Sequence, residues 1–276
     1  MKKKTLRKKK ENFIVGNYKK CYSFLNEISW YVVFALGIFM FTFLIGFSYP
    51  HFFEEEIKTF IQGLITSLDG KSISYLVGYI FANNIKAALF SFVLGITFGV
   101  FPLITLITNG YLLGFVSRMV VSGEGGLFVL LRLLPHGIFE LPAILLSIGI
   151  GLKIGHDLMR KYNWKEEKNI ISYIIFIITL LVTGICLLII GSNIVNLFNG
   201  WVGQIISAGI TILFALISLT ISFNFSLILF PEKIKNQRKL IAKKYVSDPL
   251  RFFFSVILPL LIIAAIIEGV LIGLRV

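Results

Sequence analysis

Residues 81–156 decide the fold of this chain. They read FANNIKAALFSFVLGITFGVFPLITLITNGYLLGF over 81–115 and VSRMVVSGEGGLFVLLRLLPHGIFELPAILLSIGIGLKIGH over 116–156. The stretch is apolar enough to lie in a bilayer, yet it contains Asn, Lys, Arg, His and Glu and is rich in Gly. Ionisable groups at membrane depth are costly, so they tend to be functional or to hold helices together. The stretch therefore predicts membrane helices that carry a polar site.

The rest of the chain supports the same class of protein. Of its 276 residues 57% are hydrophobic, and the mean hydropathy is +0.87. The apolar residues come in blocks of about 20, the length of helix that crosses the hydrocarbon layer. The prediction is an all-α fold, a polytopic transmembrane helical bundle of six or seven spans with its N-terminus in the cytoplasm.

Proline and glycine set the expected boundaries of the spans. Pro50 ends the first, Pro102 kinks the inner end of the second, and Pro135 begins the fourth. The third segment starts after Gly110 and is too short for a comfortable crossing, which predicts a broken or re-entrant third segment. The expected spans are 28–49, 79–106, 110–124 with 127–134, 135–154, 170–190, 205–230 and 252–274.

Charge predicts the domain organisation and the orientation. Residues 1–26 form a basic cytoplasmic arm, and 27–276 a single transmembrane domain. The arm, the loop after the fourth span and the segment before the last span hold 21 of the 27 Lys and Arg residues. Cytoplasmic loops collect such residues, so the basic loops are expected in the cytoplasm and the protein in the plasma membrane. The same rule explains the net charge of +13 without nucleic acid as a partner.

Two segments outside the spans are predicted to be amphipathic helices. Residues 52–74 place apolar side chains at i, i+3, i+4, i+7 and i+8, starting from Ile57, which gives one apolar stripe. This helix either lies on the outer interface, caps the bundle or is an ordinary packed connection. Residues 231–249 form a basic interfacial helix at the inner side.

Small residues recur four apart on several spans, a spacing that lets helices touch. We expect the stripe on the second span to pack against the stripe on the fourth. The helix-packing residues are Ala87, Ser91, Gly95, Gly99, Gly110, Gly114, Ala143, Ser147, Gly151, Gly155, Ala265, Gly269 and Gly273.

Polar side chains from four spans are expected to meet in the outer half of the bilayer. Glu140 and Glu268 should pair with basic members of this group, because unpaired charges are not viable there. The group is either a structural lock, a proton-, ion- or substrate-handling site, or a metal or hydrolytic site. The members of the intramembrane polar cluster are Asn83, Asn84, Lys86, Arg118, Arg132, His136, Glu140 and Glu268.

The sequence favours neither a metal nor a cofactor nor catalysis. Zinc needs three or four ligands, and the three His residues are spread along the chain. No HExxH, Walker or GxGxxG motif is present, and no nucleophile lies beside a base. We therefore expect no cofactor, no metal and no enzyme. The expected partners are membrane lipid and other membrane proteins or further copies of the chain.

The central stretch resembles the stage II sporulation protein M family. The resemblance is carried by Asn83-Asn84, Gly95 and Gly99 with Pro102, Asn109-Gly110, Leu113-Gly114, Pro135-His136-Gly137, Glu140-Leu141-Pro142-Ala143, and Glu268 after Ala264-Ala265. It is strong over residues 81–156 and loose on the flanks.

The resemblance implies a polytopic membrane protein. The sporulation member is thought to assemble and localise peptidoglycan hydrolases and is not itself known as a hydrolase. Two alternative functions are therefore expected. One is a non-enzymatic scaffold or assembly factor for an envelope membrane complex. The other is a permease-like or channel-like component with a polar cavity open to the outside.

Overall fold

The computed structural model describes residues 13–96, 99–124, 126–161 and 246–274, with the single helical positions 174, 178 and 210. These residues are helical apart from short turns and contain no strand, so the all-α prediction is confirmed for them. The expected spans 170–190 and 205–230, and most of the basic helix 231–249, lie outside the described residues. Among the described residues, the helices long and apolar enough to cross a membrane are Ile14–Ser48, Ile73–Val93, Val100–Ser122, Gly137–Asp157 and Asp248–Gly273.

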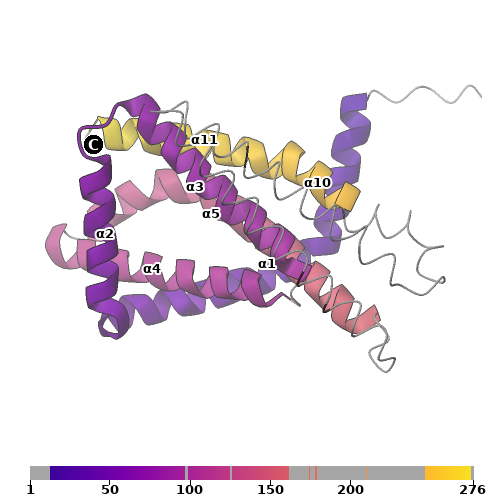
Figure 1. Ribbon diagram of the computed structural model, residues 1–276, viewed down its shortest axis with the longest axis horizontal. Helices are drawn as coiled ribbons and strands as arrows, with labels where there is room; N and C mark the ends of the chain where they lie inside the picture. The colour runs from indigo at the N-terminus through magenta and orange to yellow at the C-terminus, as the bar shows by residue number, and fades with distance from the viewer. Residues whose placement is uncertain are drawn as a thin grey trace, which may run out of the picture.

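Helix α1 (Phe13–Ser48) has 36 residues and begins inside the expected basic arm rather than near Ile28. Figure 1 shows its N-terminal part running across the direction of the rest of the helix. Ser29 Oγ donates to the Asn26 carbonyl oxygen over 2.9 Å, and such bonds to the preceding turn bend helices. The helix ends at Ser48, just before Pro50, as predicted.

A short turn, η1 (Pro50–Phe53), leads into α2 (Glu54–Leu68), the amphipathic helix that the apolar stripe predicted. Figure 1 shows α2 running across one end of the bundle. None of its residues is buried, so α2 is not an ordinary packed connection. Gly70 follows it with φ +69°, a conformation that glycine adopts without strain.

Helix α3 (Ile73–Val93) starts at an N-cap, Ser72, whose side chain accepts a hydrogen bond from the Tyr75 backbone N–H. It passes into η2 (Leu94–Ile96), so the expected helix over 79–106 is wrong. Gly99, with φ +79°, stands directly before the next helix and marks the reversal of the chain.

Helix α4 (Val100–Glu124) contains residues 107–109, which were expected to lie between the second and third spans. Asn109 Nδ2 donates to the Thr105 carbonyl oxygen over 2.7 Å, within the helix. Pro102 lies in the first turn, where a missing N–H costs no hydrogen bond, rather than at a kink. The 25 residues extend about 37 Å. The expected short third segment is therefore wrong.

Helix α5 (Gly126–Lys161) begins nine residues before the expected start and continues beyond the expected end at Ile154. Pro135 lies inside it rather than at its first position, so that boundary is also wrong. The C-terminal span is continuous from α10 (Asp248–Phe252) through a π-helical turn, η4 (Phe253–Ile257), into α11 (Leu258–Gly273). This agrees with the expected span 252–274.

Helix α5 lies at the centre of the described bundle and contacts α1, α3, α4 and α11. Helix α4 packs along α1, and α11 packs along α3. Lipid is as apolar as the core side chains, so close packing rather than the hydrophobic effect must hold such helices together. The most deeply buried core residues include Ile28, Ala88, Leu106, Ile148, Ile150, Phe253, Ile257 and Leu261.

Candidate functional site

The predicted polar cluster is carried by α3, α4, α5 and α11. Of these helices, α3, α5 and α11 all contact one another. Asn83 is exposed and Asn84 is buried on α3, and Lys86, Glu140 and Glu268 are half-buried on the three mutually contacting helices. The backbones of Arg132 and His136 belong to α5, and their side chains lie outside the described part.

Contacts between glycines and neighbouring helices fix the levels of the two acidic residues. Gly273 faces Ile73 and Gly269 faces Val77, so α11 runs antiparallel to α3. Counted from these contacts, Glu268 of α11 lies at about the same level along the axis of the helix pair as Gly78 of α3.

On the other side of α3, Gly151 of α5 faces Ser91 and Gly95. Figure 1 shows α5 running in the same direction as α3. Counted back along α5 at about 1.5 Å per residue, Glu140 therefore lies near the level of Ala82. Glu140 and Glu268 thus occupy similar levels of the α3–α5–α11 contact.

Arg118 lies elsewhere, at the contact between α4 and α1. It is exposed, and its guanidinium carbon is 5.6 Å from the centroid of the Phe47 ring. A cation over an aromatic face is attracted by the ring quadrupole. The structure therefore places Arg118 beside α1, on the same face of α4 as Gly114, which meets the Phe43 carbonyl.

Buried polar atoms without a hydrogen-bond partner within the described part include Asn84 Nδ2 on α3 and Ser147 Oγ on α5. Asn84 is 5% exposed and Ser147 is fully buried. Because an unsatisfied buried polar group costs free energy, these two atoms mark where the interior of the bundle departs from simple apolar packing.

The small-residue stripes lie at backbone contacts between helices. Gly95 lies against the backbone of Gly151, and Gly151 also meets Ser91 and Pro102. Gly110 meets the side chain of Thr42 on α1. Ser91 Oγ donates to the Ala87 carbonyl, while Ala143, Ser147, Gly155 and Ala265 are buried. Gly99 belongs to the break before α4 and not to the stripe of α3.

A second group of ionisable residues, the Lys153 group, lies where α1 and α5 meet. It consists of Glu27, Tyr31, Lys153, His156 and Asp157. Lys153 Nζ is 3.5 Å from both Glu27 Oε2 and Asp157 Oδ2. Tyr31 Oη is 2.7 Å from His156 Nδ1. The exposed fraction is only 7% for Lys153 and 8% for Asp157.

The Lys153 group was not expected from the sequence, because Lys153 stands at the end of the expected span 135–154 and was counted with the basic loop that follows it. The helix continues instead, and the lysine is buried against α1, with Nζ 6.0 Å from the centroid of the Phe24 ring. The i, i+4 spacing of Lys153 and Asp157 was the available signal, since such a pair shares one helix face. This arrangement can neutralise a buried charge and join two helices.

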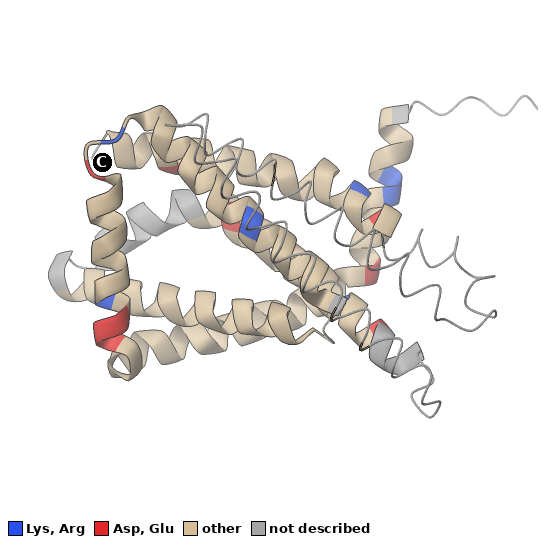
Figure 2. Ribbon diagram, in the orientation of Figure 1, with Lys and Arg blue, Asp and Glu red and all other residues tan. Residues whose placement is uncertain are grey.

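The described residues include no group of three His, Cys, Asp or Glu side chains that could hold a metal ion. Figure 2 shows few charged residues along the bundle helices and a group of acidic residues at the start of α2. That acidic start belongs to a polar network outside the spans.

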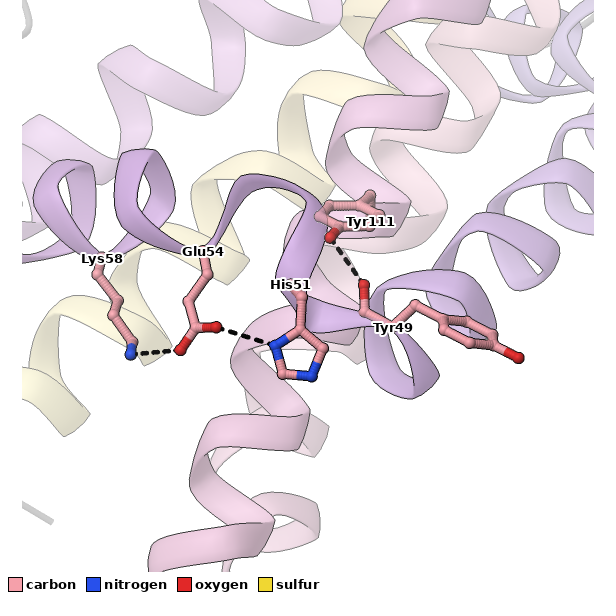
Figure 3. A network of polar contacts seen from close by, with 5 residues as sticks. All are labelled: Tyr49, His51, Glu54, Lys58 and Tyr111. Carbon is pink, nitrogen blue, oxygen red and sulfur yellow. Dashed lines mark hydrogen bonds and ion pairs between the residues drawn. The ribbon is translucent and has the colours of Figure 1, made fainter.

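Figure 3 shows this network, in which Glu54 accepts hydrogen bonds from Lys58 and His51. Close by, Tyr111 Oη donates to the Tyr49 carbonyl oxygen over 3.0 Å and so joins α4 to the end of α1. The hydrogen bonds from Lys58 and then His51 lower the pKa of Glu54.

The lowered pKa gives a pH prediction for the start of α2. A depressed carboxyl pKa stabilises the folded form at pH above the ordinary value, and this is lost as pH falls through the lowered one. In Lys58→Met we expect the Glu54 pKa to rise toward its ordinary value. Carbon-13 carboxyl titration by NMR would measure it, with Lys71→Met as the control. An unchanged Glu54 midpoint in Lys58→Met would contradict the assigned cause.

Comparison with known proteins agrees with the resemblance in the central stretch. A family model described as Stage II sporulation protein M matches residues 31–198. An uncharacterized protein of Methanocaldococcus jannaschii is 27% identical over 142 residues, covering 50% of this chain and 75% of that protein. No solved structure matches the chain. The matched region contains α2, α3, α4, α5 and the second half of α1.

Proposed function

The chain belongs to the stage II sporulation protein M family, and from that premise we propose that it is a non-enzymatic membrane scaffold. In this proposal the bundle is a rigid support that assembles other membrane proteins into an envelope complex in the plasma membrane. The basic segments face the cytoplasm. The α3–α5–α11 polar groups and the Lys153 group hold helices together and do not react with a substrate.

One contrast supports this proposal. The inner helices are joined at backbone contacts such as Gly95 with Gly151, while the outward side of α1 carries large apolar side chains that are exposed. Phe34 and Phe41 are 56% and 62% exposed and lie seven residues apart on one helix face. A tightly packed interior with a wide apolar exterior suits a protein whose surface, rather than a cavity, carries its function.

The scaffold proposal predicts that removing exposed apolar side chains from α1 releases partner proteins without unfolding the chain. Tagged full-length protein should be extracted from its native membrane in polymer-bounded lipid discs, and co-purifying membrane proteins quantified by mass spectrometry. We expect a small set of partners at a constant ratio. Phe34→Ala with Phe41→Ala should reduce that ratio several-fold and leave thermal stability unchanged.

A matched substitution on another exposed helix face, Ile262→Ala with Ile266→Ala, controls for general loss of surface area. Purification of the wild-type chain without partners at a constant ratio would overturn the scaffold proposal.

The two orphaned polar atoms favour a second candidate, a permease-like component. Asn84 Nδ2 and Ser147 Oγ lie on the helices that also carry Lys86 and Glu140, and polar atoms without protein partners are where water or a polar solute is held. This candidate predicts pH-dependent solute flux in proteoliposomes. His136→Ala should abolish the flux with the fold retained, and absence of flux in the wild type would exclude it.

A further inference from the structure

The first part of α1, residues 13–26, packs on the described part of the bundle along one of its faces. Cys21 and Phe24 lie on that face with exposed fractions of 4% and 6%. Asn17 Nδ2 donates to Ser255 Oγ of η4 over 2.9 Å. These contacts fix residues 13–26 against α10 and η4, so the segment is a defined part of the fold.

A second face of the same segment is apolar and exposed. Its side chains are Ile14, Val15, Tyr18 and Tyr22, with exposed fractions of 62%, 48%, 56% and 66%. At about 100° per residue they form one continuous sector beside the buried face. The remaining sector is polar and contains Lys19, Ser23 and Asn26. The segment is therefore amphipathic on the part of its surface that does not touch the bundle.

The direction of this segment matches a membrane surface. Figure 1 shows the N-terminal part of α1 lying across the end of the bundle opposite to α2. From Trp30, 81% exposed, to Tyr49, 62% exposed, α1 rises about 28 Å, close to the hydrocarbon thickness of about 30 Å. Aromatic side chains of this kind gather at the two boundaries of a membrane. Residues 13–26 therefore lie at the boundary on the Trp30 side.

We propose that residues 13–26 of α1 are an amphipathic anchor that lies on anionic phospholipid headgroups of the leaflet at the N-terminal end of α1. Tyr18 and Tyr22 enter the interface, and Lys19, which is exposed on the neighbouring sector, faces the phosphates. Lys20, also exposed, adds positive charge from the far side of the same helix. The sequence before the helix adds seven basic residues between positions 2 and 10. Stable attachment at a surface takes an apolar and an electrostatic contribution together, and this segment has both.

The charge argues against a second copy of the chain on this face. Two copies joined through Tyr18 and Tyr22 would bring their lysines, and the basic residues before them, close to one another. Like charges across an interface oppose association, whereas anionic lipid satisfies both the aromatic and the basic side chains.

Nitroxide accessibility in the reconstituted full-length chain tests the anchor. In a common background with Cys21→Ala and Cys186→Ala, one label is placed at Tyr22→Cys and a control label at Ser23→Cys. The vesicles are phosphatidylcholine with or without phosphatidylglycerol. With phosphatidylglycerol we expect the label at 22 to be shielded from an aqueous nickel reagent and reached by oxygen. The label at 23 should stay accessible to nickel.

Reversing the charge of Lys19 and Lys20 tests whether anionic lipid, rather than a protein, covers this face of residues 13–26. Lys19→Glu with Lys20→Glu should raise nickel access to the label at 22 at least about fivefold, because each basic residue near an anionic surface strengthens attraction by roughly that factor. Lys71→Glu, on the exposed turn before α3, should change nothing. Equal access to the label with and without phosphatidylglycerol would overturn the proposal, as would dipolar broadening from a label on a second copy.

Discussion

Replacing Gly151 by valine is expected to cost the bundle at least about 3 kcal/mol, the upper end of what overpacking a core costs. A Cβ atom at this position would run into the carbonyl oxygen of Ser91 and come within 2.8 Å of Pro102 Cγ. Neither group is the flexible end of a side chain. The substitution must therefore push α5 away from α3 and from the start of α4 together.

The unfolding midpoint in one detergent, read by fluorescence-detected size exclusion after heating, measures the effect of Gly151→Val. Gly37→Val is the matched control, because a Cβ at Gly37 of α1 would meet nothing within 4 Å. Gly37→Val also replaces a glycine by a valine within a span and should shift the unfolding midpoint only slightly. Similar midpoints for the two variants would show that the α3–α5 contact is not a main source of stability.

Replacing Lys153 by methionine is expected to have the second-largest effect, a loss of about 3–5 kcal/mol. The lysine is buried and lies 3.5 Å from carboxylate oxygens of Glu27 and Asp157. Without it, Asp157, 8% exposed, keeps its charge in the interior and loses the ammonium group that lies 3.5 Å from its carboxylate. Most of the loss is therefore expected from the reduced compensation of a buried charge, and less of it from the strength of the ion pair itself.

Two further variants separate these contributions. In Lys153→Met with Asp157→Leu no charge is left buried, so much of the stability should return. Glu27→Gln should cost under about 1 kcal/mol, because that side chain is 53% exposed and its pair is screened by water. Thermal and chemical unfolding of the three variants in the same detergent would provide the comparison. If the double variant were less stable than Lys153→Met, the assigned cause would be wrong.

The helical class and the approximate positions of the apolar helices were predictable, because about twenty consecutive apolar residues have few alternatives to a membrane helix. The α2 helix was predictable for a similar reason, since its apolar residues follow the helical period starting at Ile57. These signals are local in the sequence. Packing against other helices modifies them little.

The breaks between helices were less predictable, because their cause is tertiary. Asn109-Gly110 is typical of a turn, yet Gly110 is needed where α4 touches Thr42 and Phe39 of α1. The true break uses Gly99, which sequence analysis had assigned to a packing stripe. A glycine serves both purposes, and only its neighbours in space distinguish them.

The candidate site likewise contains residues whose positions follow from helix geometry and residues whose positions depend on tertiary packing. The levels of Glu140 and Glu268 follow from helix geometry once the partners are known, whereas Arg118 required knowledge that α4 packs on α1. Lys153 was misplaced because a basic residue near the end of a span is typical of a loop. Its burial depends on the contact with α1, which lies more than a hundred residues earlier in the chain.

The π-helical turn η4 sets the direction in which the side chains of the following helix, α11, point around the helix axis. A turn that contains one extra residue shifts the angular phase of the next helix by about 100°. With that offset, Phe253 packs toward Phe92 of α3 while Gly269 and Gly273, further along, also meet α3. A relative that lacked one residue between 253 and 257 would rotate its terminal glycines, and the glutamate at 268 with them, toward a different neighbour.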